Sequence, residues 1–148
     1  MDRTAIFELI NKNPGFFLAT IDDMDKNLPR VRGMLLYKAD ESGIIFHTGA
    51  FKDVYKQILK NPNVQLCFFD PLQNIQVRIR GTLKIADSND LKEEISEHPT
   101  RAFLKGWKSS VPLQEFYDSF IVFLMNDGIA NVWTIETNLD AKTDIDLF

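Results

Sequence analysis

The segment from Pro29 to Pro62 constrains the fold of this chain more than any other part of the sequence. Gly43 supplies a residue that can adopt the positive φ of a tight hairpin turn. Asn61 precedes a proline and therefore disfavours the helical conformation, so a helix must end there. The segment is predicted to contain, in order, a strand over 29–39, a turn over 40–43, a strand over 44–48 and a helix over 51–60.

The rest of the chain continues this pattern of short elements separated by turns. The further predicted elements are a helix over 2–11, strands over 16–21, 64–69 and 75–85, a helix over 87–97, a helical turn over 101–107, a loop over 108–112, a strand over 116–124, a hairpin turn at 126–128 and a strand over 129–135. Residues 136–148 are polar and are predicted to form a loosely held tail. Strands joined by short turns favour an antiparallel barrel over a doubly wound sheet. We therefore predict a mainly β fold, with a single domain over 1–148.

Composition excludes several classes of function. The 148 residues carry a formal net charge of -4, which argues against non-specific nucleic-acid binding. No apolar run approaches the ~20 residues that span a bilayer, and no signal peptide begins the sequence, so no membrane association and a cytoplasmic location are expected. Cys67 is the single cysteine and only two histidines are present, so no metal site is predicted.

The strand over 29–39 begins with a basic pair. Arg30 and Arg32 are two residues apart and therefore project from the same face of the strand. Arginine can clamp a phosphate with two parallel hydrogen bonds. Gly33 leaves room for a flat ligand to approach the backbone. A solvent-facing edge with two solubilising arginines is the alternative. The apolar wall that follows consists of Met34, Leu35 and Leu36.

A second polar group falls where the next strand passes into the helix. His47, Thr48 and Lys52 lie there, and the start of a helix favours an anion. Gln76 heads the alternating strand on its polar side, where its amide suits the polar edge of an isoalloxazine ring. Trp133 can stack on a ring or pack at an interface. The alternatives are a simple helix cap for Thr48, a solvated residue for Lys52 and a half-buried polar residue for His47.

The chain resembles the pyridoxamine 5'-phosphate oxidase-like superfamily, whose members are flavoproteins with an FMN-binding split barrel. The resemblance lies in an ordered set: Arg32-Gly33-Met34-Leu35-Leu36-Tyr37, Phe46-His47-Thr48, a helix closed by Asn61-Pro62, and Gln76 before Gly81.

The resemblance implies a role for each matching residue. It implies that Arg32 reaches the FMN phosphate or ribityl chain, that the backbone over 33–36 lines the ring and that Gln76 touches the ring. It places His47 and Thr48 as the aromatic-hydroxyl pair at the end of the next strand. The oxidase has a basic pair where this chain has Asp53 and Val54, so Lys52 or Lys56 is expected to make the phosphate contact instead.

The resemblance also implies a function. The chain looks like the small flavoproteins and nitroimidazole-reductase-like members, so we expect an FMN-dependent reductase of a small aromatic or nitro compound. NADH or NADPH would be the electron donor, and a homodimer would hold FMN at its interface, with Trp133 reaching the partner's flavin. Pyridoxamine phosphate oxidation is not expected, because the oxidase's C-terminal basic residues have no match. A non-catalytic FMN carrier, a redox sensor, and a barrel that binds heme or a deazaflavin are the alternatives.

Overall fold

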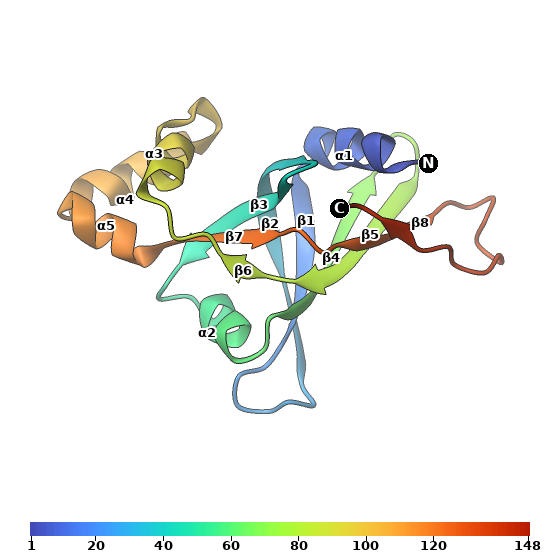
Figure 1. The fold of residues 1–148 in the computed structure, drawn as a ribbon, viewed down its shortest axis with the longest axis horizontal. Coiled ribbons are helices and arrows are strands. Elements are labelled where there is room, and N and C mark those ends of the chain that lie inside the picture. The colour runs from blue at the N-terminus through green and yellow to red at the C-terminus, as the bar shows by residue number, and fades with distance from the viewer.

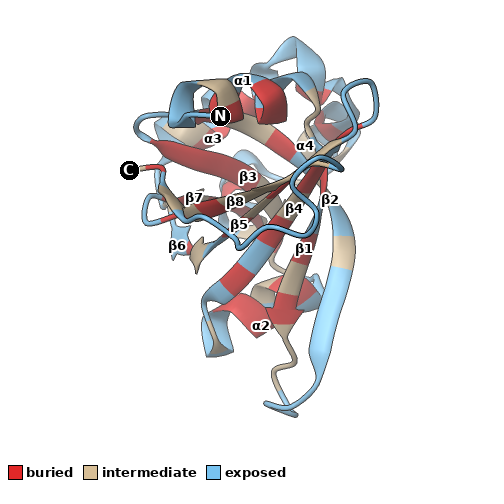
Figure 2. Cartoon of the chain, turned by 90° about the vertical axis from the view of Figure 1, so that its right-hand side faces the viewer, coloured by how far each residue is buried: buried red, intermediate tan, exposed pale blue.

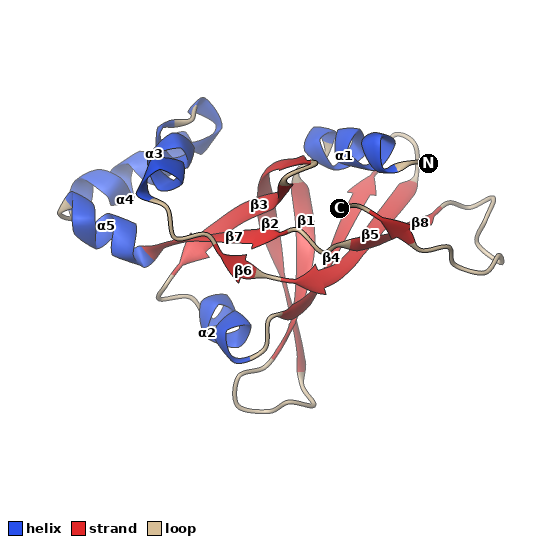
Figure 3. Ribbon diagram, in the orientation of Figure 1, coloured by secondary structure: helices blue, strands red, loops and turns tan.

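Antiparallel strands dominate the computed structural model, which describes residues 1–148 (Figures 1 and 3). The strands are β1 (Gly15–Ile21), β2 (Pro29–Asp40), β3 (Gly43–Gly49), β4 (Asn63–Asp70), β5 (Ile75–Thr82), β6 (Lys84–Ile85), β7 (Phe120–Met125), β8 (Ile129–Trp133) and β9 (Ile145–Asp146). They form one nine-stranded sheet in the order β6-β7-β3-β2-β1-β4-β5-β8-β9.

Short helices flank the sheet. They are α1 (Arg3–Lys12), α2 (Asp53–Lys60), α3 (Asn89–Glu97), the 3-10 helix η1 (Pro99–Leu104), α4 (Lys105–Ser110) and α5 (Leu113–Ser119). The segment from α3 to α5 gathers at one end of the sheet, and we call it the helical cap (Figure 1). None of the helices combines the length and the apolar character needed to cross a bilayer.

Two features curl the sheet into a split barrel. Strand β2 pairs with β1 along its first half and with β3 along its second half, and the β2–β3 pairing contains a bulge between Leu36 and Lys38. The chain then leaves β5, passes Leu83 and adds β6 beside β7, at the far edge of the strand order. Consecutive residues therefore link the two sides of the sheet, so the predicted mainly β, antiparallel split-barrel fold is confirmed.

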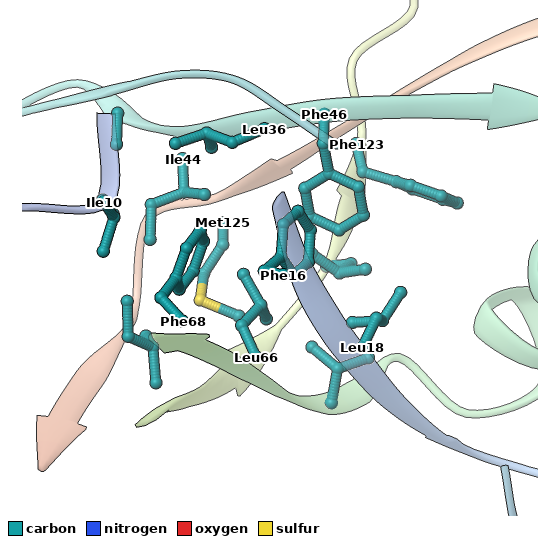
Figure 4. Packing of buried hydrophobic residues seen from close by; sticks show 14 of the residues in the cluster. Ile10, Phe16, Leu18, Leu36, Ile44, Phe46, Leu66, Phe68, Phe123 and Met125 are labelled. Atoms are coloured by element: carbon teal, nitrogen blue, oxygen red, sulfur yellow. The ribbon is translucent and has the colours of Figure 1, made fainter. Parts of the chain in front are cut away.

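Aromatic packing fills the barrel (Figure 4). Phe16 of β1 stacks on Phe68 of β4 with ring centroids 4.7 Å apart and meets Phe46 of β3 edge-on at 5.1 Å. Phe46 in turn contacts Phe123 of β7 at 5.4 Å. All four rings belong to one cluster of 23 buried residues. These contacts join strands that are far apart in the sequence, so they fix which face of each strand points inward.

Strands β3 and β7 are buried on both faces. Ile44 and Phe46 point into the barrel, whereas Ile45 packs against the helical cap in a second cluster of 7 buried residues. Phe120 and Val122 of β7 belong to this second cluster as well. Burial on both faces explains why β7 is a continuous apolar run rather than an alternating one.

The cap contains the largest error in the sequence prediction. Residues 116–124 were predicted to form one strand, but residues up to Ser119 form helix α5 and only the remainder belongs to β7. Phe116 and Phe120 stack with their centroids 5.2 Å apart. They are four residues apart, a spacing that brings side chains together on a helix. The expected loop over 108–112 is likewise wrong, because α4 extends to Ser110.

Three further predictions in the second half of the chain are wrong. The strand over 75–85 is interrupted at Leu83, because β6 leaves the register of β5 and pairs with β7. Residues 126–128 do not form a hairpin turn, since β7 pairs with β3 and β6 whereas β8 pairs with β5 and β9. The tail is not loose at its end: β9 pairs with β8, Leu147 is fully buried, and Phe148 contacts Phe7.

Arg101 fastens the cap to the barrel. Its Nε donates to Nε2 of His47 on β3 at 2.8 Å, and its Nη2 donates to the carbonyl of Leu36 on β2 at 2.8 Å. The guanidinium also lies over the rings of Tyr37 and Phe103. Only 2% of Arg101 is exposed. The cap is therefore held by a buried cation whose partners are a ring nitrogen, carbonyls and aromatic faces.

His47 must remain neutral to make this contact, because Arg101 can only donate and the ring must offer a lone pair. Burial, and then the neighbouring charge of Arg101, lowers the pKa of His47 to about 4. His47 is thus protonated at a lower pH in the folded state than in the unfolded chain.

We predict that Leu147→Ala destabilises the protein by about 2–4 kcal/mol, because it leaves a cavity in the barrel core. Leu139→Ala is a matched control in the same segment: Leu147 is 0% exposed and Leu139 is 95% exposed. The control should change the free energy of unfolding by less than about 0.5 kcal/mol. Urea denaturation of both variants measures the difference, and equal midpoints would show that the C-terminal residues are not part of the core.

We also predict that His47 makes stability fall as the pH falls from 6.5 towards 4. The unfolded histidine gains a proton near its usual pKa of 6.5, whereas the folded one stays neutral until about 4. Between pH 7 and pH 5 this should remove about 1–2 kcal/mol. His47→Gln keeps an acceptor that does not titrate, so denaturant melts at the two pH values should show a smaller loss.

Candidate functional site

Arg32 makes more side-chain hydrogen bonds than any other predicted phosphate ligand. Its Nη1 donates to the carbonyl of Leu18 at 3.2 Å and to Oγ1 of Thr20 at 2.7 Å. Its Nη2 donates to Oε1 of Gln57 on α2. These bonds use three of the five N–H groups of a guanidinium, so two donors remain for a ligand. Arg32 is therefore held in one orientation and still has hydrogen-bonding capacity.

The exposed arginines form ion pairs, whereas the less exposed arginines do not. The exposed Arg3, Arg30 and Arg80 pair with Glu41, Asp22 and Asp144 respectively. The less exposed arginines form no ion pair, and they are Arg32, Arg78 and Arg101. Charges withdrawn from water normally need a partner of opposite sign. The positive charges of these less exposed arginines are therefore not neutralised by a carboxylate, at positions where solvent screens them least, although the chain as a whole is acidic.

The surroundings of Arg32 are electrostatically mixed. Desolvation, followed by repulsion from Arg30, lowers the pKa of Arg32 from its usual value, and attraction to Asp53 at the start of α2 opposes this effect. Arg30 itself is turned to Asp22, with Nε and Oδ1 2.9 Å apart. The two arginines expected to act as a pair thus have different partners: Arg30 is neutralised, and Arg32 is not.

The start of α2 supplies the lysines. Lys52 is the N-cap residue of α2, its side chain is exposed, and its Nζ lies 5.9 Å from the ring of Phe51. Lys56 follows one turn later and is exposed as well. Neither lysine forms an ion pair. Thr48, at the end of β3, is half-buried. Both lysines are therefore free to reach an anion near the first turn of α2.

The ring-contacting candidates lie on a different surface, the outer face of β2, β1, β4, β5 and β8. Gln76 and Trp133 stand directly opposite each other on β5 and β8, and Phe69 is the partner of Gln76 on β4. Nε1 of Trp133 donates to Asn138 at 2.7 Å. Exposed and buried residues alternate along these strands (Figure 2). We call this surface the outer face, and it includes Phe17, Val31, Gly33, Leu35, Cys67, Phe69, Gln76, Arg78 and Trp133.

The apolar wall of β2 is divided between the two faces. Met34 and Leu36 pack against the barrel core, whereas Gly33 and Leu35 are exposed. A shallow groove runs over this part of the sheet, lined by Gly15, Phe16, Phe17, Gly33, Met34 and Leu35. No atom lies within 4 Å of the position that a Cβ at Gly33 would occupy, so the backbone is open to a flat ligand there.

One chain does not bring all the candidates together. Arg32 lies on the same face of β2 as Leu36, towards the barrel interior, whereas Gln76 lies on the outer face. His47 and Thr48 are adjacent on β3 and therefore point to opposite faces. His47 faces Arg101 beneath the cap. The phosphate and ring candidates thus form two groups: one beside α2 and one on the outer face.

Sequence reasoning missed several residues of this arrangement. Gln57 lies three residues after Val54 on α2, so helical periodicity could have placed it on the buried face beside Arg32. Arg78 lies on the same side of β5 as Gln76 and was not singled out, yet its Nε is buried and has no hydrogen-bond partner. No sequence signal indicates Arg101, because its partners lie 54 and 65 residues away along the chain.

Sequence comparison identifies the family. The pyridoxamine 5'-phosphate oxidase family profile matches residues 3–118. A pyridoxine/pyridoxamine 5'-phosphate oxidase from Agrobacterium fabrum is 30% identical over 114 residues, which are 76% of this chain and 54% of the relative. One from Mesorhizobium japonicum is 32% identical over 107 residues, or 71% of this chain and 51% of the relative. The chain thus spans about half the length of these curated relatives.

Solved structures share the fold. A NimC/NimA family protein from Clostridium acetobutylicum superposes with a TM-score of 0.74 at 18% identity, covering 98% of this chain and 93% of the other. An FMN binding protein from Nostoc punctiforme gives 0.61 at 17% identity, with 99% and 96% covered. A heme binding protein from Mycobacterium smegmatis gives 0.69 at 12% identity, with 99% and 58% covered. An F420 reductase gives 0.55 at 21% identity, with 80% and 90% covered.

At these identities the structural neighbours establish the fold, and the profile match establishes the family. The match extends from the first helix through α5 and therefore includes the Arg32 cluster, the start of α2 and the outer face as far as β5. The chain belongs to the pyridoxamine 5'-phosphate oxidase-like family of split-barrel proteins.

Proposed function

We propose that this protein binds FMN and uses it as an oxidoreductase that reduces a small aromatic or nitro compound. The observation that carries the proposal is Arg32, which is held in place by neutral groups, has no ion-pair partner and retains two free donors. A phosphate group would supply the missing negative charge and accept both remaining hydrogen bonds. The FMN binding protein from Nostoc, which shares the fold, supports the same ligand.

In this proposal Arg32 binds the phosphate of FMN, and Lys52 or Lys56 adds a second positive charge from α2. The exposed backbone at Gly33 and the amide of Gln76 contact the ring. Bound FMN would supply the hydride chemistry, while the protein provides binding, orientation and the electrostatic environment. NADH or NADPH would bind transiently as the electron donor.

We further propose that two copies of the chain pair through their outer faces. The face carries exposed apolar side chains: 63% of Phe17, 68% of Val31 and 46% of Phe69 are exposed. Contiguous exposed apolar surface of this kind marks an interaction site. The unsatisfied Nε of Arg78 also lies within this face. Pairing would cover these groups, and FMN would then lie at the interface between the two copies.

A different ligand is the second candidate. Structural neighbours include a heme binding protein and an F420 reductase, so heme or a deazaflavin is the alternative ligand for this barrel. A non-catalytic role as an FMN carrier or redox sensor is also consistent with a site in which no side chain has to act as an acid or base.

We predict that Arg32→Ala and Lys52→Ala each weaken FMN binding by about 10- to 100-fold, since each removes a charged contact worth roughly 1.5–3 kcal/mol. The measurement is titration of the apoprotein with FMN, followed by flavin fluorescence. Arg3→Ala, at an exposed position on α1, is the control and should bind like the parent. Unchanged affinity in both test variants would show that Arg32 and Lys52 do not bind the phosphate of FMN. A parent protein that binds heme or F420 but not FMN would favour a different ligand.

The same preparation separates an enzyme from a carrier. Anaerobic mixing of the FMN-loaded protein with NADH or NADPH should bleach the flavin absorption, and a nitroaromatic acceptor should restore it over repeated turnovers. Slow bleaching without turnover would indicate a carrier or sensor.

We predict that Phe17→Glu converts a dimer into a monomer, because it places a charge at the centre of the outer face. Leu113→Glu is the control on the cap, since Leu113 is also exposed, at 52% against 63% for Phe17. Sedimentation equilibrium of the parent and both variants measures the effect. A monomeric parent, or equal dissociation of the two variants, would contradict pairing through this face.

A further inference from the structure

Gln57 is an unusual partner for a half-buried arginine. It lies on the inner side of α2 and is only 3% exposed, while Thr20 beside it is 2% exposed. Oγ1 of Thr20 donates to Oε1 of Gln57, and both oxygens accept from Arg32. The three side chains therefore form a closed ring of hydrogen bonds between β1, β2 and α2.

The chemistry of the ring fixes the orientation of each group. Every N–H of Arg32 is a donor, so Gln57 must present its amide oxygen rather than its nitrogen. The Thr20 hydroxyl accepts a hydrogen bond from Arg32 and donates one to the amide oxygen of Gln57. A guanidinium held at two of its nitrogens in this way cannot rotate without breaking several bonds. Its two remaining donors, Nε–H and one N–H of Nη2, keep a fixed direction.

The neutrality of Gln57 is as important as its position. A glutamate there would accept the same hydrogen bonds, but it would also cancel the charge of Arg32. Gln57 fixes the guanidinium and leaves its charge intact, and no carboxylate forms an ion pair with Arg32. Binding to a phosphate depends strongly on that charge, because charge-assisted hydrogen bonds are about twice as strong as neutral ones.

We infer that Gln57, together with Thr20, is a positioning residue that keeps Arg32 charged and directed at a phosphoryl group, and so makes the site select phosphorylated flavin over riboflavin. The inference rests on the proposed FMN site and adds the residue that sets its specificity. Riboflavin has the same ring and ribityl chain as FMN and lacks only the phosphate, so the ratio of the two affinities isolates this contribution.

The test compares Gln57→Glu and Thr20→Val with the parent chain, using FMN and riboflavin as separate ligands in fluorescence titrations. Gln57→Glu should weaken FMN binding by about tenfold or more and change riboflavin binding by less than about threefold. Thr20→Val removes the bridging hydroxyl without adding charge, so it should give a smaller loss in the same direction. Gln114→Glu makes the same chemical change at an exposed position on the cap and should leave both affinities unchanged.

The outcomes distinguish a failure of this inference from a failure of the proposed FMN site. If the parent binds FMN but Gln57→Glu and Thr20→Val leave the FMN-to-riboflavin ratio unchanged, the positioning role is wrong and the FMN site stands. If both variants weaken FMN and riboflavin equally, the ring of hydrogen bonds serves only to stabilise the fold. If the parent binds neither flavin, both the proposed function and this inference fall. Thermal melts of each variant check that it is folded.

Discussion

Contacts among four phenylalanines in the barrel determine how the rest of the molecule is arranged. Phe16, Phe46, Phe68 and Phe123 come from four different strands, and their rings lie within 5.4 Å of one another in successive pairs. Side chains alternate along a strand, so fixing one residue inward forces its neighbours outward. The inward position of Phe46 sends His47 to the cap. In the same way, the inward position of Phe16 leaves Phe17 on the outer face.

The placement of charge follows from this division of faces. Arg32 and Arg101 are both withdrawn from solvent, and each is held by neutral oxygen or nitrogen acceptors rather than by carboxylates. Neutral partners satisfy the hydrogen bonds of a cation but leave its field uncancelled. For Arg101 the consequence is structural, because the buried group ties the cap to β2 and β3. For Arg32, which keeps free donors, the consequence is an affinity for anions beside α2.

Local patterns predicted the first half of the chain well, because its elements depend on near neighbours. Gly43 and Pro62 mark the ends of their elements through backbone conformation alone, and β2, β3 and α2 lie where these residues place them. Prediction failed in the second half, where burial on both faces removes periodicity. Residues 116–124 are apolar except for Asp118 and Ser119, and packing between the barrel and the cap decides that α5 ends at Ser119 and that β7 begins at Phe120.

The sequence by itself determined the order of the elements in the first half of the chain, the split-barrel family and the presence of a basic group around Arg32 and Lys52, because these follow from residue types at short spacings. Tertiary structure alone decided which of those groups meet. It turned Arg30 to Asp22 and Arg32 to Gln57, and it separated Gln76 from Arg32 by placing them on opposite faces of the sheet. The physical reason is that strand register and curl set the direction of each side chain, and both depend on contacts between residues far apart in the sequence.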